Sequence, residues 1–157
     1  MDAQPVLFTI AKAIHQHGLE VVMIGNSAAA LQGAPVTTID IDFLFRKTPA
    51  NLKKLKAIAK ELGGVLLKPY YPSSDLFRLM RDEDTLQLDF MATIHGIRSF
   101  EGLRSRAKRI DLGGHSILVA GLADIIKSKR AAGRAKDRAV LEILKKALDE
   151  KEDHKEE

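Results

Sequence analysis

Two segments of the chain alternate between apolar and polar residues. Over residues 38–45, Asp40 and Asp42 are separated and flanked by isoleucine and phenylalanine, and over residues 85–91 the polar positions include Asp89. Successive side chains of a β-strand point to opposite faces, so this alternation predicts two strands, each with one apolar and one polar face. Asp40 and Asp42 therefore share the polar face of the first strand, and Asp89 lies on the polar face of the second.

The rest of the chain divides into helical and extended segments at glycine and proline residues. Pro49 opens one helical pattern and Gly63-Gly64 ends it, which is the usual placement of these residues at helix starts and stops. The expected elements, in chain order, are a helix over 6–17, a strand over 20–25, a short helix over 27–32, the strand over 38–45, a helix over 49–62, strands over 65–68, 76–81 and 86–91, a basic helix after Phe100, a hairpin around Gly113-Gly114, and helices over about 121–131 and 135–150.

The length and this order of elements predict one α+β domain, with a mixed β-sheet packed with helices and a helical C-terminal extension. A chain of 157 residues is long enough to bury a sizeable core within one domain. We expect the domain over residues 1–148, with a core at about 5–95 and a basic extension at about 96–148. Residues 149–157 carry six acidic side chains and two lysines, and such charged ends are usually flexible.

The three acids on the predicted strands are candidate metal ligands. Asp40 and Asp42 are two residues apart on one strand face, which separates them by roughly 6–7 Å along the chain. Two carboxylates placed in this way can share one or two divalent cations, and Asp89 joins them if its strand lies alongside. Three oxygen ligands suit Mg²⁺ or Mn²⁺. The alternative is that the pair is solvated at an exposed edge and that Asp89 faces solvent or pairs with a nearby arginine.

The turn formed by Gly25, Asn26 and Ser27 joins a short apolar strand to the short helix. A glycine turn that enters a helix presents backbone N–H groups and the positive end of the helix dipole to an anion. The Ser27 hydroxyl either caps that helix or binds a phosphate oxygen. Many turns between a strand and a helix use glycine and serine for geometry alone. This turn therefore indicates a phosphate site only in combination with the three acids.

The segment from Ile24 to Asp42 resembles the signature of the nucleotidyltransferase (polymerase beta-like) superfamily, and it is most similar to the small prokaryotic branch that includes AbiEii-type toxins. That signature has a Gly-Gly or Gly-Ser turn, an Asp-x-Asp strand and a third acid on a later strand. The resemblance implies an enzyme that uses Mg²⁺ or Mn²⁺ to transfer a nucleotide from a nucleoside triphosphate to an acceptor hydroxyl, releasing pyrophosphate. It assigns catalysis and metal binding to Asp40, Asp42 and Asp89, and phosphate binding to Gly25, Asn26 and Ser27.

The resemblance extends to a basic segment near the C-terminus. These small proteins have a basic motif that ends one helix and starts the next, and the segment with Lys129, Arg134 and Lys136 is similar to it. The resemblance implies that these three side chains supply positive charge to the triphosphate or acceptor. Asp137 would orient one of them. The alternative is a solvated basic helix face. The sequence departs from the family pattern at two positions. Asn26 stands where relatives carry glycine or serine, and Val36 stands where relatives often carry arginine.

Charge and composition limit the partners that we expect. The net charge is +4, and because the last nine residues carry −4, the remainder of the chain carries +8. A basic body suits a polyanionic partner, which is a triphosphate alone or a nucleic acid as well. The chain has no cysteine, so disulfides and thiolate metal sites are excluded. It has no apolar run that could span a membrane and no signal-peptide pattern, so we expect a cytoplasmic protein.

Several functions stay open at this level. The nucleotide could be ATP or another triphosphate, and the acceptor could be an RNA, a protein or a small molecule. A homodimer or a cognate partner protein would be usual for such small relatives. The alternative to an enzyme is a catalytically weak module of the same fold that binds a nucleotide or a nucleic acid. Such a module could act as part of a toxin–antitoxin-like pair. Serine catalysis is disfavoured, because Ala29 stands where a nucleophile elbow needs glycine.

Overall fold

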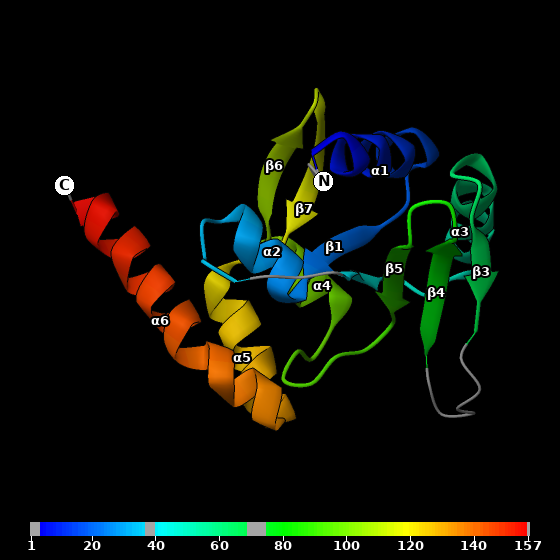
Figure 1. Ribbon diagram of the computed structural model, residues 1–157. Coiled ribbons are helices and arrows are strands. Elements are labelled where there is room, and N and C mark those ends of the chain that lie inside the picture. The colour runs from blue at the N-terminus through cyan, green and yellow to red at the C-terminus, as the bar shows by residue number, and fades with distance from the viewer. Residues whose placement is uncertain (1–3, 37–39, 69–74, 157) are drawn as a thin grey trace.

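The computed structural model describes residues 4–36, 40–68 and 75–156. Within these residues one mixed sheet of seven strands is combined with six helices (Figure 1). The elements are α1 (Gln4–His17), β1 (Val21–Ile24), α2 (Gly25–Leu31), β2 (Ile41–Phe45), α3 (Pro49–Glu61), β3 (Val65–Leu67), β4 (Leu76–Arg81), β5 (Leu86–Met91), α4 (Phe100–Arg106), β6 (Lys108–Leu112), β7 (His115–Val119), α5 (Leu122–Ala132) and α6 (Ala135–Glu156).

The predicted fold class, an α+β domain with a mixed sheet, is confirmed. The strand order is β3-β4-β5-β2-β1-β7-β6. β2 pairs parallel with β5, and β1 pairs parallel with β7, whereas all other neighbouring strands are antiparallel. The strand that carries Asp89 therefore lies beside the strand that carries Asp42, and these two residues are register partners. Residues 38 and 39 of the predicted strand lie outside the described residues, and the strand begins at Ile41, so the prediction that Asp40 belongs to it is wrong: Asp40 lies in a bend just before β2.

The region after residue 95 contributes to the sheet as well as to the helices. The β6–β7 hairpin pairs with β1 through Met23 and Val119, so that it completes one end of the sheet. Helix α6 extends away from the sheet toward the C-terminus (Figure 1). It continues to Glu156, beyond the predicted end of the helix at about residue 150, while the flexibility of residues 149–157 stays a prediction. No glycine or proline interrupts residues 135–156, and glutamate and lysine favour helical backbone, so the helix can continue beyond its contacts with α5.

Local sequence explains where the helices begin. Thr48 caps α3, because its side-chain oxygen accepts a hydrogen bond of 3.1 Å from the Asn51 backbone N–H, and Pro49 occupies the first turn. Ser99 caps α4 in the same way through Gly102. Within the described residues no helix is long and apolar enough to cross a membrane.

The core lies on the apolar faces of the central strands. The rings of Phe43 on β2 and Phe90 on β5 are stacked with centroids 5.1 Å apart, and Phe45 meets Phe90 edge to face. All three side chains are buried. Helix α2 packs on β1 and β2, while α5 contacts α2 and α6 (Figure 1). This arrangement places the first turn of α2 and the helical pair α5–α6 near the ends of β2 and β5.

Replacing the central ring of this core should destabilise the whole domain. Phe90→Ala removes a fully buried ring between Phe43 and Phe45, so we expect the free energy of unfolding to fall by about 3–5 kcal/mol. Leu67→Ala on the edge strand β3 is the control, since Leu67 is 45% exposed and should change stability by no more than about 0.5 kcal/mol. Urea denaturation followed by circular dichroism measures both. Equal losses for the two variants would contradict this account of the core.

Candidate active site

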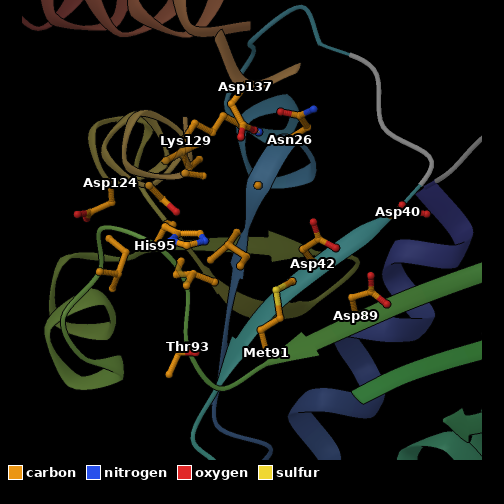
Figure 2. A pocket seen from close by; sticks show the side chains of 18 of the residues that line it. Asn26, Asp40, Asp42, Asp89, Met91, Thr93, His95, Asp124, Lys129 and Asp137 are labelled. Carbon is orange, nitrogen blue, oxygen red and sulfur yellow. The ribbon is translucent and has the colours of Figure 1, made fainter. Parts of the chain in front are cut away.

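A cavity of about 740 Å³ lies between the strands β2, β4 and β5 on one side and the helices α5 and α6 on the other. Figure 2 shows the sheet acids Asp42 and Asp89 on one wall, with Asn26, Lys129 and Asp137 across the cavity. The fold thus brings together residues from the two ends of the chain. Seven of the eight sequence-predicted site residues line the cavity: Gly25, Asn26, Asp40, Asp42, Asp89, Lys129 and Arg134.

The carboxylates of Asp40, Asp42 and Asp89 act on one another. The pKa of Asp42 is raised from the ordinary value of 3.8 to about 6, first by burial of the carboxylate and then by the negative charges of Asp89 and Asp40. The positive charges of Lys129 and Lys136 oppose this effect only in part. The cavity therefore concentrates negative charge around Asp42 without enough cationic side chains to balance it.

Asp89 already has a cationic partner in Arg78. The Arg78 guanidinium donates from Nε to Oδ1 at 2.8 Å and from its terminal NH2 group to Oδ2 at 3.3 Å, and the Gln87 side-chain amide also reaches both oxygens. Asp89 is only 7% exposed. Of the alternatives that the sequence left open, pairing with a nearby arginine is therefore observed. Arg78 was not predicted as a site residue, because its opposition to Asp89 depends on the pairing of β4 with β5.

The acids fit a divalent cation, although they do not form a complete ligand set as they stand. Within the described parts of the chain, no group of three His, Asp or Glu side chains is arranged to hold a metal ion. Asp40 and Asp42 line the same cavity, and the pKa of Asp42 is raised by burial and, to a smaller extent, by the charges of Asp89 and Asp40, which a cation would offset. Carboxylate oxygens are the ligands that Mg²⁺ and Mn²⁺ prefer. Arg78 and Gln87 already donate to both oxygens of Asp89.

Gly25 allows the first turn of α2 to approach Asp42 closely. Its φ of +69° lies in the left-handed region, and an added Cβ would come within 3.2 Å of Asp42 Oδ2. The Asn26 Oδ1 atom is buried and accepts no hydrogen bond from the described residues. A polar atom of this kind at the cavity wall is suited to contact a bound ligand directly or through water.

The predicted cap by Ser27 is wrong. The N-cap position of α2 is Ile24, without a side-chain cap, and the Ser27 hydroxyl donates to the Ile24 carbonyl oxygen at 3.1 Å. Ser27 is 5% exposed and does not line the cavity. The hydroxyl satisfies a local backbone acceptor, as serine often does near a helix start, so its side chain is not presented to a phosphate.

Asp137 holds two cationic side chains at the opposite wall. It accepts from Arg134 Nε at 2.6 Å and NH2 at 3.3 Å, and Lys129 Nζ lies 3.6 Å from its Oδ1. Burial acts to raise the pKa of Asp137, which is 1% exposed, but the hydrogen bonds and charge of Arg134 together with Lys129 bring it below the usual value. Burial also lowers the pKa of Lys129, and Asp137 offsets this in part. Asp137 therefore positions both cations.

Other residues singled out in the sequence have different positions. His95 lines the cavity, in a loop whose Gly96 packs against the backbone of α5. His15 and His115 make an edge contact with centroids 5.4 Å apart, outside this cavity. Val36 packs against the core.

Solved structures with a similar fold are nucleotidyltransferases. The resistance factor ANT(2'')-Ia, solved with adenylyl-2''-tobramycin, has a TM-score of 0.64 and 16% identity, over 92% of this chain and 88% of that one. TM1012 from Thermotoga maritima, described as a nucleotidyltransferase, has a TM-score of 0.64 and 23% identity, over 93% and 92%. The lincosamide adenylyltransferase LnuA, solved with lincomycin, has a TM-score of 0.63 and 15% identity, over 90% and 96%.

Residues 4–155 match the family described as "Nucleotidyl transferase of unknown function (DUF2204)", and the chain belongs to that family. The comparison with curated proteins gave no match. The resemblance to polymerase beta-like nucleotidyltransferases is therefore confirmed, and with it the expected class of enzyme and the transfer of a nucleoside monophosphate. Which residues carry out the transfer stays a prediction.

The raised pKa of Asp42 predicts a pH-dependent effect on stability. Between the ordinary value of 3.8 and about 6, the native protein keeps a proton that the unfolded chain has lost, so stability falls as pH rises through this range. Asp42→Asn stays neutral. Without divalent cations it should be more stable than the wild type by roughly 1–3 kcal/mol at about pH 7.5, and should differ little near about pH 4.

Urea denaturation in the presence of a chelator at both pH values measures this effect. Asp82→Asn is the matched control, because Asp82 is exposed and does not line the cavity. A stability difference that stays constant across this pH range would contradict the assignment of the raised pKa to Asp42.

Proposed function

We propose that the cavity binds a nucleoside triphosphate with Mg²⁺ or Mn²⁺ and transfers its nucleoside monophosphate to a hydroxyl group of a small-molecule acceptor. The observation that carries this proposal is the pairing of Asp42 with Asp89 on adjacent parallel strands, directly against Gly25 at the start of α2. It supports a site in which carboxylates and a close backbone turn meet at one point.

In this proposal Asp40 and Asp42 hold the cation, and Asp89 completes the ligand set. The bound cation would neutralise phosphate charge and lower the pKa of the acceptor hydroxyl. The acceptor oxygen forms a bond to the α-phosphorus while the bond to the bridging oxygen breaks, and pyrophosphate leaves with that electron pair. Asp89 takes the hydroxyl proton. Catalysis rests mainly on positioning and charge stabilisation.

The turn at the start of α2 and the helical wall would bind the triphosphate. Gly25 and Asn26 line the cavity, and Gly25 has no side chain to keep a phosphate away from the backbone. Lys129 and Arg134 neutralise the charge that develops on pyrophosphate. Ser27 contributes by holding the Ile24 carbonyl and so the shape of the turn, rather than by its hydroxyl.

ATP and a small hydroxylated acceptor are the substrates that we favour. Among the proteins of similar fold, the ANT(2'')-Ia structure contains adenylyl-2''-tobramycin, and LnuA is an adenylyltransferase with lincomycin bound. Both modify small molecules, and a cavity lined by acidic and basic side chains suits such a reaction. An RNA or a protein acceptor would appear in the same experiment as a different labelled product.

A nucleotide-binding module with little transferase activity is the second candidate. The observation that favours it is the engagement of both Asp89 oxygens by Arg78 and Gln87, which leaves the ligand set incomplete. Such a protein would bind nucleotide in a metal-dependent manner without releasing pyrophosphate.

The first prediction of this proposal is label transfer that depends on Asp42. We would incubate the protein with each α-³²P-labelled triphosphate and Mg²⁺ or Mn²⁺, adding a panel of hydroxylated small molecules, total RNA or cell protein. The α-label should enter an acceptor, whereas γ-³²P label should leave as pyrophosphate. Asp42→Asn should abolish transfer and keep its fold, and the exposed control Asp82→Asn should keep activity. Wild-type turnover by Asp42→Asn would refute the mechanism.

The second prediction concerns the position of the cations. Asp137→Asn removes the negative charge that pairs with Lys129 and one of the two oxygens that accept from Arg134, so the KM for the triphosphate should rise by about tenfold, as for loss of one charge-assisted hydrogen bond. Glu142→Gln breaks an exposed ion pair with Lys145 on the same helix and is the matched control. Steady-state kinetics on protein shown to be folded by circular dichroism measures both. An unchanged KM for Asp137→Asn would show that Asp137 has no role in triphosphate binding.

A further inference from the structure

The ion pair between Arg78 and Asp89 lies inside the cavity rather than on an outer surface. Arg78 on β4 and Asp89 on β5 are register partners, and the side chains of both residues line the cavity. The carboxylate side chain is 10% exposed and the guanidinium side chain 34% exposed. The guanidinium is therefore the more accessible member of the pair.

Arg81, on the same strand as Arg78, forms an ion pair that serves as a comparison. Arg81 binds Asp84 through Nε at 2.9 Å and NH2 at 2.7 Å, and it also donates to the Leu62 carbonyl. That pair does not line the cavity and stabilises the turn between β4 and β5. Arg78 differs, because its partner is the register neighbour of Asp42.

The same two oxygens of Asp89 have two competing uses. A divalent cation shared with Asp42 would need at least one of them, and the Arg78 guanidinium together with the Gln87 amide occupies both. A guanidinium and a cation cannot neutralise the same carboxylate at close range without repelling each other. The absence of a three-residue ligand group among the described residues agrees with this competition.

We propose that Arg78 is a positioning residue that competes with the divalent cation for Asp89, so that the third carboxylate joins the cation only when the guanidinium has left it. This inference rests on the proposed function, because it takes Asp40, Asp42 and Asp89 as the cation ligands. In the cation-free protein, Arg78 holds Asp89 in one rotamer. Its positive charge also reduces the electrostatic repulsion between Asp89 and Asp42. The pair thus stabilises the empty cavity and opposes its filling.

Binding of Mn²⁺ to the nucleotide-free protein tests the competition directly. The electron paramagnetic resonance signal of free Mn²⁺ gives the dissociation constant without any enzyme turnover. Arg78→Gln should tighten Mn²⁺ binding by about tenfold, since one charge-assisted hydrogen bond no longer opposes the cation. Arg78→Lys keeps the positive charge but loses the planar fork, so its binding should lie between those of the wild type and Arg78→Gln.

Two controls separate competition for Asp89 from a general change of charge or fold. Lys136→Gln removes one positive charge from the cavity lining without touching Asp89, so it measures the effect of charge alone. Arg81→Gln breaks the comparable pair on the same strand and should leave Mn²⁺ binding unchanged. Thermal unfolding with and without Mn²⁺ supplies a second readout, in which Mn²⁺ should stabilise Arg78→Gln more than the wild type.

A double-mutant cycle decides the outcome. In an Asp89→Asn background, Arg78→Gln should tighten Mn²⁺ binding no more than Lys136→Gln does, because the contested carboxylate is gone. If Arg78→Gln matches Lys136→Gln in the otherwise wild-type protein, the competition is refuted while the proposed function stands. If Asp42→Asn leaves Mn²⁺ binding unchanged, the cation site itself is refuted, and with it the proposed function.

Discussion

The parallel register of β2 with β5 is the constraint on which both the core and the site depend. It pairs Phe43 with Phe90 on the buried side, where their rings stack, and it pairs Asp42 with Asp89 one residue earlier on the cavity side. A shift of one residue would exchange these faces, exposing the rings and burying the acids in the core. The apolar packing that stabilises the sheet therefore also forces two carboxylates together, at a cost that the rest of the cavity must offset.

The cavity offsets that cost unevenly. Arg78 compensates Asp89, and on the opposite wall Asp137 is compensated by Arg134 and Lys129. Asp42 is half-buried, and burial together with the charges of Asp89 and Asp40 raises its pKa more than Lys129 and Lys136 lower it. Asp89 and Asp137, the buried acids among the described residues, each have a close cationic partner, whereas Asp42 lies where the glycine turn approaches the sheet. This imbalance is the physical reason to place a cation there.

The sequence predicted the elements well wherever one face of an element is buried, because burial imposes a period on the side chains. The alternation of apolar and polar residues around Asp42 and Asp89 identified both central strands. The sequence could not show that these strands are neighbours, which the strand order of the sheet establishes. Ser27 was misassigned because a hydroxyl near a helix start can bond to either end of the local backbone. Arg78 was missed because a contact across two antiparallel strands depends on their register, which no local pattern specifies.

Two contacts outside the carboxylate cluster connect the elements on either side of the cavity. Gln32, buried at the end of α2, donates from Nε2 to the Ala120 carbonyl at 2.7 Å and so joins α2 to the chain just before α5. Gly96 packs so closely on α5 that an added Cβ would lie 2.9 Å from the Lys127 carbonyl oxygen. These contacts hold the backbone around α5, and Asp137 then positions the Lys129 side chain, so backbone packing and ion pairs together preorganise the cavity.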